Sequence, residues 1–265
     1  MTLRQDVGPV PPDSMVQSYS GSALAEQYVV LGDTIHAFLV NYGGLQPHHK
    51  VLDVGCGIGL MARPLTSFLA PEGSYDGFDV VLEPIEWCRQ HYREYPRFTF
   101  QRADVYNKHY NPKGRFTARE YVFPYPAGTF DMVVLTSVFT HLLPEDLTNY
   151  LAEIARVMKP GARCLITYFL LNPESIERIE SWLKEHPDAA DRGVPGGLGF
   201  RWKFGDHCRL YSKDVPETAV AYSERWLADQ YASHGLSIDL INHGEWCRRS
   251  FQPGWQDLIL AVKNP

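Results

Sequence analysis

The sequence lacks the features of membrane, secreted and nucleic-acid-binding proteins. No apolar run in its 265 residues approaches the roughly 20 residues that span a bilayer, and the N-terminal stretch is polar and proline-rich, unlike a signal peptide. There is no basic run or basic tail, and the net charge is −6, which argues against general binding to nucleic acid or to a membrane surface. We therefore expect a cytoplasmic protein that acts on a small molecule, with no nucleic-acid and no membrane partner.

Cysteine is also scarce and irregularly spaced. The five cysteines form no CxxC pair, so the sequence indicates neither a disulfide framework nor a zinc site, and reduced thiols are expected. His48 and His49 are adjacent, but no acidic or cysteine partner stands at metal-ligand spacing, which favours a surface pair. We predict no metal ligands.

The most informative stretch that is present is VLDVGCGIG, residues 51–59. It predicts a buried strand that runs into a glycine turn and then a helix, the usual geometry for holding a nucleotide-like ligand at a helix N-terminus. The third glycine of the dinucleotide fingerprint is missing, because Leu60 occupies its position. Asp53, just before the loop, would repel a pyrophosphate. A cationic ligand fits this pattern better.

The same stretch resembles motif I of the class I S-adenosylmethionine-dependent methyltransferases, in the small-molecule branch of types 11 and 25. The resemblance extends over residues 50–171. It implies that S-adenosylmethionine is the cofactor and that Asp53, Gly55, Cys56 and Gly57 belong to its binding site. The alternatives are a glycine turn that serves packing alone and, for the cysteine, a small residue required by the loop rather than a nucleophile.

Acidic residues end the next two predicted strands. The strand over residues 73–79 ends in Asp79, where a carboxylate can accept hydrogen bonds from both ribose hydroxyls, and Val80 follows it toward the adenine. The alternative for this aspartate is a helix N-cap. By the resemblance, Asp104 accepts from the adenine amine and the N–H of Val105 reaches a ring nitrogen; a solvated loop aspartate is the alternative.

The chemistry is expected where the fourth predicted strand ends. Thr136 and Ser137 follow this strand at the topological switch point of the sheet, beside the cofactor. His141 lies one turn later and is the candidate general base, because an imidazole can take a proton from a hydroxyl or an amine near neutral pH. A histidine that only holds the loop is the alternative. Tyr168 is a second candidate for the catalytic pocket.

The two ends of the chain are expected to cover the site. Residues 1–18 predict a flexible lead-in and residues 19–49 a helical cover, in which the resemblance implies that Tyr19 and Tyr28 contact the methionine moiety or the substrate. The alternative is that they belong to the core, where tyrosines in a helical stripe are more often found. Residues 172–265 hold five of the six tryptophans and are expected to form the acceptor half. The candidate walls for a planar or apolar acceptor are Trp202 and Trp246.

Together these features predict one α/β methyltransferase domain over residues 19–265, with the cofactor-binding core at residues 50–171. We expect a Rossmann-like, seven-stranded, mostly parallel sheet with helices on both faces and an antiparallel terminal pair, in an order resembling 3-2-1-4-5-7-6. The expected activity is methyl transfer to an oxygen, nitrogen or carbon acceptor, as a natural-product or sugar tailoring step. A nicotinamide-dependent oxidoreductase and a non-catalytic S-adenosylmethionine-binding protein are the alternatives. Monomer and homodimer are both left open.

Overall fold

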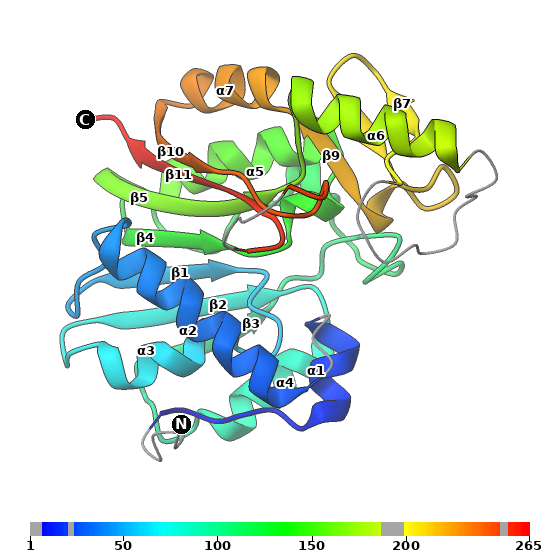
Figure 1. Cartoon of the computed structure of the whole chain (residues 1–265). Coiled ribbons are helices and arrows are strands. Elements are labelled where there is room, and N and C mark those ends of the chain that lie inside the picture. The colour runs from blue at the N-terminus through cyan, green and yellow to red at the C-terminus, as the bar shows by residue number, and fades with distance from the viewer. Residues whose placement is uncertain (1–6, 21–23, 187–198, 250–253) are drawn as a thin grey trace.

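The computed structural model describes residues 7–20, 24–186, 199–249 and 254–265. A seven-stranded sheet forms the framework of this part of the chain (Figure 1), in the order β10-β11-β5-β4-β1-β2-β3. Its strands are β1 (Lys50–Val54), β2 (Ser74–Asp79), β3 (Phe98–Arg102), β4 (Phe130–Leu135), β5 (Met158–Tyr168), β10 (Leu236–Asn242) and β11 (Asp257–Lys263). β11 runs antiparallel to both of its neighbours, whereas β1 to β5 run parallel. The predicted order 3-2-1-4-5-7-6 is confirmed.

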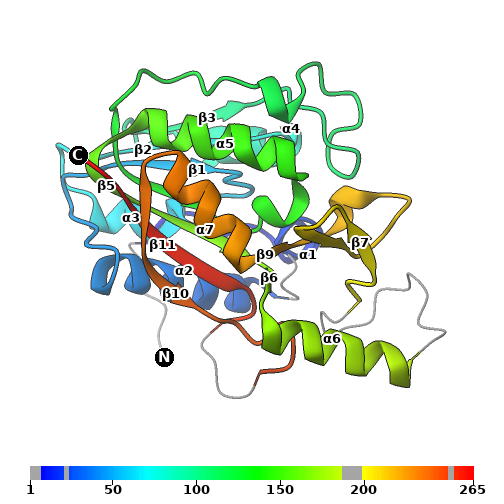
Figure 2. The same ribbon diagram turned by 90° about the horizontal axis from the view of Figure 1, so that it is seen from above.

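Helices cover both faces of this sheet (Figures 1 and 2), because the central strands are apolar on both sides. In β1, Leu52 and Val54 pack into one core and Val51 into the other. On the Val51 face lie α2 (Ala25–Asn41), α3 (Ala62–Phe68) and α4 (Leu82–His91), and on the opposite face lie α5 (Pro144–Val157) and α7 (Glu224–Ser233). None of the helices in the described ranges has the length and apolar character needed to cross a membrane.

A second, four-stranded sheet stands beside the first, with the order β6-β9-β8-β7. Its strands are β6 (Leu170–Leu171), β7 (Trp202–Phe204), β8 (Cys208–Leu210) and β9 (Val220–Ser223), and α6 (Pro173–Glu185) packs against it. A separate apolar cluster fills the space between α6 and this sheet, and it includes Trp182, Phe200 and Trp246.

The N-terminal segment departs from its prediction. A helix, α1 (Asp13–Tyr19), lies within the stretch that was predicted to be a flexible lead-in, so regular structure begins at Asp13 and not at Tyr19 as expected. Pro12 occupies the N-cap, where the fixed φ of proline and its missing N–H do no harm to the helix that follows. Val16 is fully buried against Tyr28 and Ile58, which anchors α1 to the glycine loop.

Candidate active site

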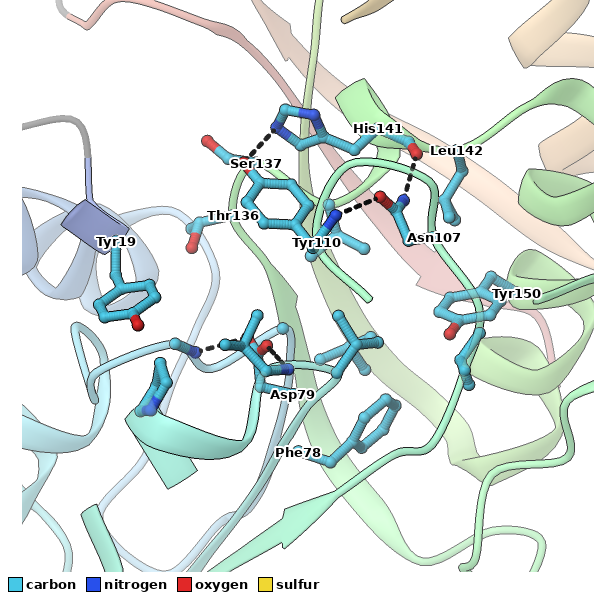
Figure 3. A pocket seen from close by; sticks show the side chains of 18 of the residues that line it. Tyr19, Phe78, Asp79, Asn107, Tyr110, Thr136, Ser137, His141, Leu142 and Tyr150 are labelled. Carbon is cyan, nitrogen blue, oxygen red and sulfur yellow. Dashed lines mark hydrogen bonds between the residues drawn. The ribbon is translucent and has the colours of Figure 1, made fainter. Parts of the chain in front are cut away.

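A pocket opens at the carboxyl ends of β1, β2 and β4, where the strand order of the sheet reverses (Figure 3). Its empty volume is about 860 Å³, part of it open to solvent. The predicted site residues that line it are Tyr19, Gly55, Gly57, Asp79, Val80, Val105, Thr136, Ser137 and His141. The structure thus brings together residues from five separate stretches of the sequence.

The glycine loop after β1 is held closely against its neighbours. The N–H groups of Gly55 and Cys56 both donate to the carbonyl oxygen of Phe78, at 2.8 and 3.0 Å, which ties the loop to the end of β2. Gly55 has a φ of +75°, and a Cβ added there would lie 2.3 Å from Cγ2 of Val138. At this position the backbone conformation and the close approach of Val138 both require glycine.

We predict that Gly55→Ala lowers the melting temperature and weakens cofactor binding by about tenfold. The methyl group forces a left-handed φ that costs an L-residue about 1–2 kcal/mol, and it displaces Val138, which lines the pocket. Gly44→Ala is the matched control, because Gly44 also has a positive φ, +66°, but nothing lies within 4 Å of its added Cβ. Thermal melts and calorimetric titration of both variants check this. Equal cofactor affinity in the two variants would contradict it.

Asp79 places a carboxylate in the pocket in a fixed orientation. Its Oδ2 accepts the N–H of Gly57 and its Oδ1 accepts the N–H of Val81, both at 2.9 Å (Figure 3). Burial raises the pKa of this carboxyl, and the backbone N–H groups of Val81 and Gly57 act in the opposite direction. Each oxygen keeps a further lone pair, so a ligand with two neighbouring hydroxyls can donate to this group.

Three residues that were predicted to touch the cofactor lie beneath the loop and do not line the pocket. Asp53 is buried; the Tyr75 hydroxyl donates to its Oδ2 at 2.6 Å, its Oδ1 has no partner, and burial raises its pKa to about 7. Tyr28 is fully buried and donates to the carbonyl oxygen of Ile58 at 3.0 Å. The thiol of Cys56 is buried, which raises its pKa well above the usual value. These side chains support the loop from below.

The turn after β3 brings one of its two predicted residues to the pocket. Val105 is buried and lines the wall. Asp104 does not line it: its carboxylate lies 3.5 Å from the guanidinium of Arg102, and its carbonyl oxygen accepts the N–H groups of Arg115 and Phe116. The segment that contains Arg115 and Phe116 therefore holds this aspartate away from the pocket.

Ser137, at the end of β4, lines the pocket with a strained backbone. Its φ is +58°, in the left-handed region that non-glycine residues rarely adopt. Its N–H donates to Oγ1 of Thr167 at 2.8 Å, and its hydroxyl donates to Oε1 of Gln256 at 2.9 Å. The Thr167 hydroxyl donates to the same Gln256 oxygen at 2.7 Å. This network maintains a conformation of the kind found at functional sites.

His141 lies in the short helix η2 (Phe139–His141), and hydrogen bonding fixes its tautomer. Its Nδ1 lies 2.9 Å from the carbonyl oxygen of Glu217, which can only accept, so Nδ1 carries the proton and Nε2 is left as an acceptor. Nε2 lies 3.4 Å from the hydroxyl of Tyr110. Burial lowers the pKa of His141 to about 4, although the Glu217 carbonyl works against this shift. The imidazole is therefore neutral at physiological pH.

Three aromatic candidates lie away from the pocket, which corrects their predicted role as its walls. Tyr168 is fully buried and its hydroxyl meets that of Tyr231 at 2.8 Å. Trp246 is fully buried, and its indole N–H donates to Asp257 at 2.5 Å. Trp202 is partly buried against the core on the α5 side of the sheet. All three side chains serve packing.

Val81 and Val138, which follow the predicted site residues at the ends of β2 and β4, also line the pocket as expected. The lining residues that were not predicted are Val54, Phe78, Pro84, Tyr106, Asn107, Tyr110, Leu142 and Tyr150. Tyr106, Asn107 and Tyr110 come from the irregular segment after β3, where neighbouring tyrosines among polar residues were the only signal in the sequence. Among the described residues that line the pocket, none is a lysine or an arginine.

Comparison with known sequences matches this chain to a methyltransferase family model and to individual methyltransferases. A family model described as a methyltransferase domain matches residues 24–214. The mitochondrial ubiquinone biosynthesis O-methyltransferase of Homo sapiens is 35% identical over 118 residues, which are 44% of this chain and 28% of that protein. The ubiquinone/menaquinone biosynthesis C-methyltransferase UbiE of Saccharophagus degradans is 24% identical over 158 residues, 56% of this chain and 57% of that protein. The matches thus span about a quarter to somewhat over half of these relatives.

Solved structures of low sequence identity share the fold. The 1,6-didemethyltoxoflavin-N1-methyltransferase of Burkholderia thailandensis, solved with S-adenosylhomocysteine, aligns over 100% of this chain and 99% of its own, with a TM-score of 0.56 and 17% identity. The magnesium protoporphyrin IX methyltransferase of Synechocystis, also with bound S-adenosylhomocysteine, covers 90% of this chain and 86% of its own, with a TM-score of 0.54 and 16% identity.

Proposed function

The chain belongs to the methyltransferase domain family, and from this we propose that its pocket binds S-adenosylmethionine and that the chain transfers a methyl group to a small-molecule acceptor. The observation that carries the proposal is the Asp79 carboxylate, fixed on two backbone N–H groups beside the glycine loop. It matches the paired hydroxyls of a ribose. The absence of lysine and arginine from the described lining residues supports this cofactor over a dinucleotide.

The residues around the pocket divide the binding task. When bound, S-adenosylmethionine supplies an activated methyl group. The ribose is held by Asp79, the chain of the methionine moiety by the loop at Gly55 and Gly57, and the adenine by Val80 and Val105. Tyr19, whose hydroxyl donates to Glu83 at 2.6 Å, closes one side of the pocket. The residues named here line the pocket, whereas Glu83 does not.

The acceptor lies on the His141 side of the pocket. Among the lining residues, Phe78, Tyr106, Leu142 and Tyr150 give the pocket apolar and aromatic walls, which supports a planar or apolar acceptor. Nε2 of His141 takes the proton that the acceptor releases, and the surrounding walls orient the reacting atom, a contribution of about 7–11 kcal/mol in well-oriented cases. We place the reaction in natural-product or sugar tailoring in the cytoplasm.

The test is methyl transfer itself. The purified chain is incubated with S-adenosylmethionine and a panel of planar hydroxyl, amine and activated-carbon acceptors, and the release of S-adenosylhomocysteine is measured. We expect release that depends on an acceptor of this kind. Tight binding of S-adenosylhomocysteine without turnover on any of them would instead indicate a non-catalytic cofactor-binding protein.

A further inference from the structure

The segment between β3 and β4 holds a small closed loop at the edge of the pocket. The N–H of Asn107 donates to the carbonyl of Asn111 at 3.1 Å, and the N–H of Asn111 donates back at 2.8 Å. The side chain of Asn107 is buried inside this loop, with 8% of the residue exposed. Burying an amide side chain costs free energy unless its polar atoms are hydrogen-bonded. The hydrogen-bond partners of Asn107 therefore indicate which groups this loop fixes in place.

Asn107 joins two parts of the pocket that are far apart in the sequence. Its Oδ1 accepts the N–H groups of His109 and Tyr110, both at 3.0 Å, and its Nδ2 donates to the carbonyl oxygen of His141, also at 3.0 Å. One amide therefore fixes the backbone of Tyr110 relative to that of His141. Figure 3 shows the three residues together on one side of the pocket, with the tyrosine hydroxyl directed at the imidazole.

The resulting pair offers one donor and one acceptor. The Glu217 carbonyl holds the proton of His141 on Nδ1, so Nε2 can only accept, and the Tyr110 hydroxyl 3.4 Å away can donate. In the structure this hydroxyl donates to Nε2 itself, so an acceptor hydroxyl has to displace that contact. It then donates its proton to Nε2 and accepts from Tyr110 with one lone pair, which leaves its second lone pair for attack. A neutral amine has a single lone pair, and a hydrogen bond from Tyr110 would occupy it.

We propose that Tyr110 and His141 form a hydroxyl-binding site, with Asn107 as the residue that positions the pair, and that the acceptor atom is therefore an oxygen. This inference rests on the proposed methyl transfer and narrows its acceptor class. The substrate is a neutral molecule with a hydroxyl on a planar or apolar body, since no lysine or arginine is found among the described lining residues to pair with an anion.

The probe experiment uses the full chain labelled with ¹⁵N-histidine and saturated with S-adenosylhomocysteine, titrated with phenol and with aniline. We expect phenol to shift the Nε2 signal of His141 and aniline to leave it in place. Tyr110→Phe should weaken the phenol effect about tenfold, the loss of one hydrogen bond. A shift of equal size with aniline, no shift with phenol, or an undiminished phenol effect in Tyr110→Phe would overturn the assignment.

The positioning role of Asn107 has a matched control in the same loop. Asn107→Asp removes the donor to the His141 carbonyl, whereas Asn111→Asp removes the equivalent amide donor to the Val105 carbonyl, 3.0 Å away on the adenine side. We expect the former to lower kcat and to raise the pH at which His141 titrates in the ¹⁵N spectrum, and the latter to raise the KM for the cofactor. If both variants changed only the melting temperature, Asn107 would have no positioning role.

The proposed function and this inference fail in different ways. A chain that transfers methyl groups to amines but not to matched hydroxyl compounds would refute the oxygen assignment and leave the proposed function intact. A chain that does not bind S-adenosylhomocysteine would refute the proposed function before any acceptor is added.

Discussion

His141→Gln is expected to lower kcat by at least about 100-fold while leaving the affinity for S-adenosylhomocysteine unchanged. The imidazole lines the pocket, its Nδ1 is held by the Glu217 carbonyl, and its Nε2 lone pair faces the Tyr110 hydroxyl, where an acceptor hydroxyl can take its place. Glutamine keeps a polar group of similar reach but has no basic nitrogen. Single-turnover rates and calorimetric titration of the same preparation separate the two effects.

The pH profile gives this prediction a second readout. The pKa of His141 is lowered to about 4, so the proton-accepting form is the majority species above that pH and is lost only as the pH falls through it. Turnover should therefore show no fall attributable to this residue between pH 8 and about pH 5. An acid limb near the ordinary value of about 6.5 would show that the imidazole is more exposed in solution.

His109→Gln serves as the control. His109 is exposed, does not line the pocket, and has its ring 6.3 Å from that of His141. Its replacement should change kcat by less than about twofold relative to the unaltered chain, which is a smaller change than the loss of one hydrogen bond would cause. If His141→Gln turned over as fast as His109→Gln, His141 would be a residue that merely holds the loop.

Asp79→Ala is expected to weaken the binding of S-adenosylhomocysteine by at least about 100-fold. Hydrogen bonds to a charged group contribute about 1.5–3 kcal/mol each, and a ribose makes two of them with this carboxylate. The substitution also leaves the N–H groups of Gly57 and Val81 without their acceptor, which loosens the loop. Calorimetric titration measures the loss directly.

Asp76→Ala is the matched control for this variant. Asp76 lies on the same strand, β2, but its carboxylate accepts the Thr99 hydroxyl at 2.5 Å and does not line the pocket. We expect its affinity for S-adenosylhomocysteine to equal that of the unaltered chain. If the folded Asp76→Ala and Asp79→Ala variants bound S-adenosylhomocysteine with equal affinity, Asp79 would not be a cofactor-binding residue.

The parallel sheet and the position of the cofactor pocket were predictable because they depend on local patterns. Val51, Leu52 and Val54 are apolar on both faces of the strand and only Asp53 interrupts them, as a strand buried on both faces requires, and the glycines follow at once. Asp79 was predictable for a related reason: the carboxyl ends of neighbouring parallel strands meet at one edge of the sheet. Residues that directly follow these strands therefore lie together in the structure.

What the sequence did not predict depends on long-range contacts. The polar segment that contains Asn107 and Tyr110 has no periodicity, and its contact with His141 follows from the way the chain folds back over the pocket. The strands β7, β8 and β9 are three or four residues long, too short for an alternating pattern to be recognised. For Trp246 and Tyr28, composition could not distinguish a pocket position from a core position. Both side chains are fully buried in the structure and belong to the core.

The central claim is that this pocket binds a sulfonium cofactor and not a dinucleotide. Calorimetric titration of the full chain with S-adenosylhomocysteine and, separately, with NAD tests it most directly. The account predicts saturable binding of S-adenosylhomocysteine at one site per chain and no heat of binding with NAD. Binding of NAD without binding of S-adenosylhomocysteine would contradict it and favour an oxidoreductase on the same fold.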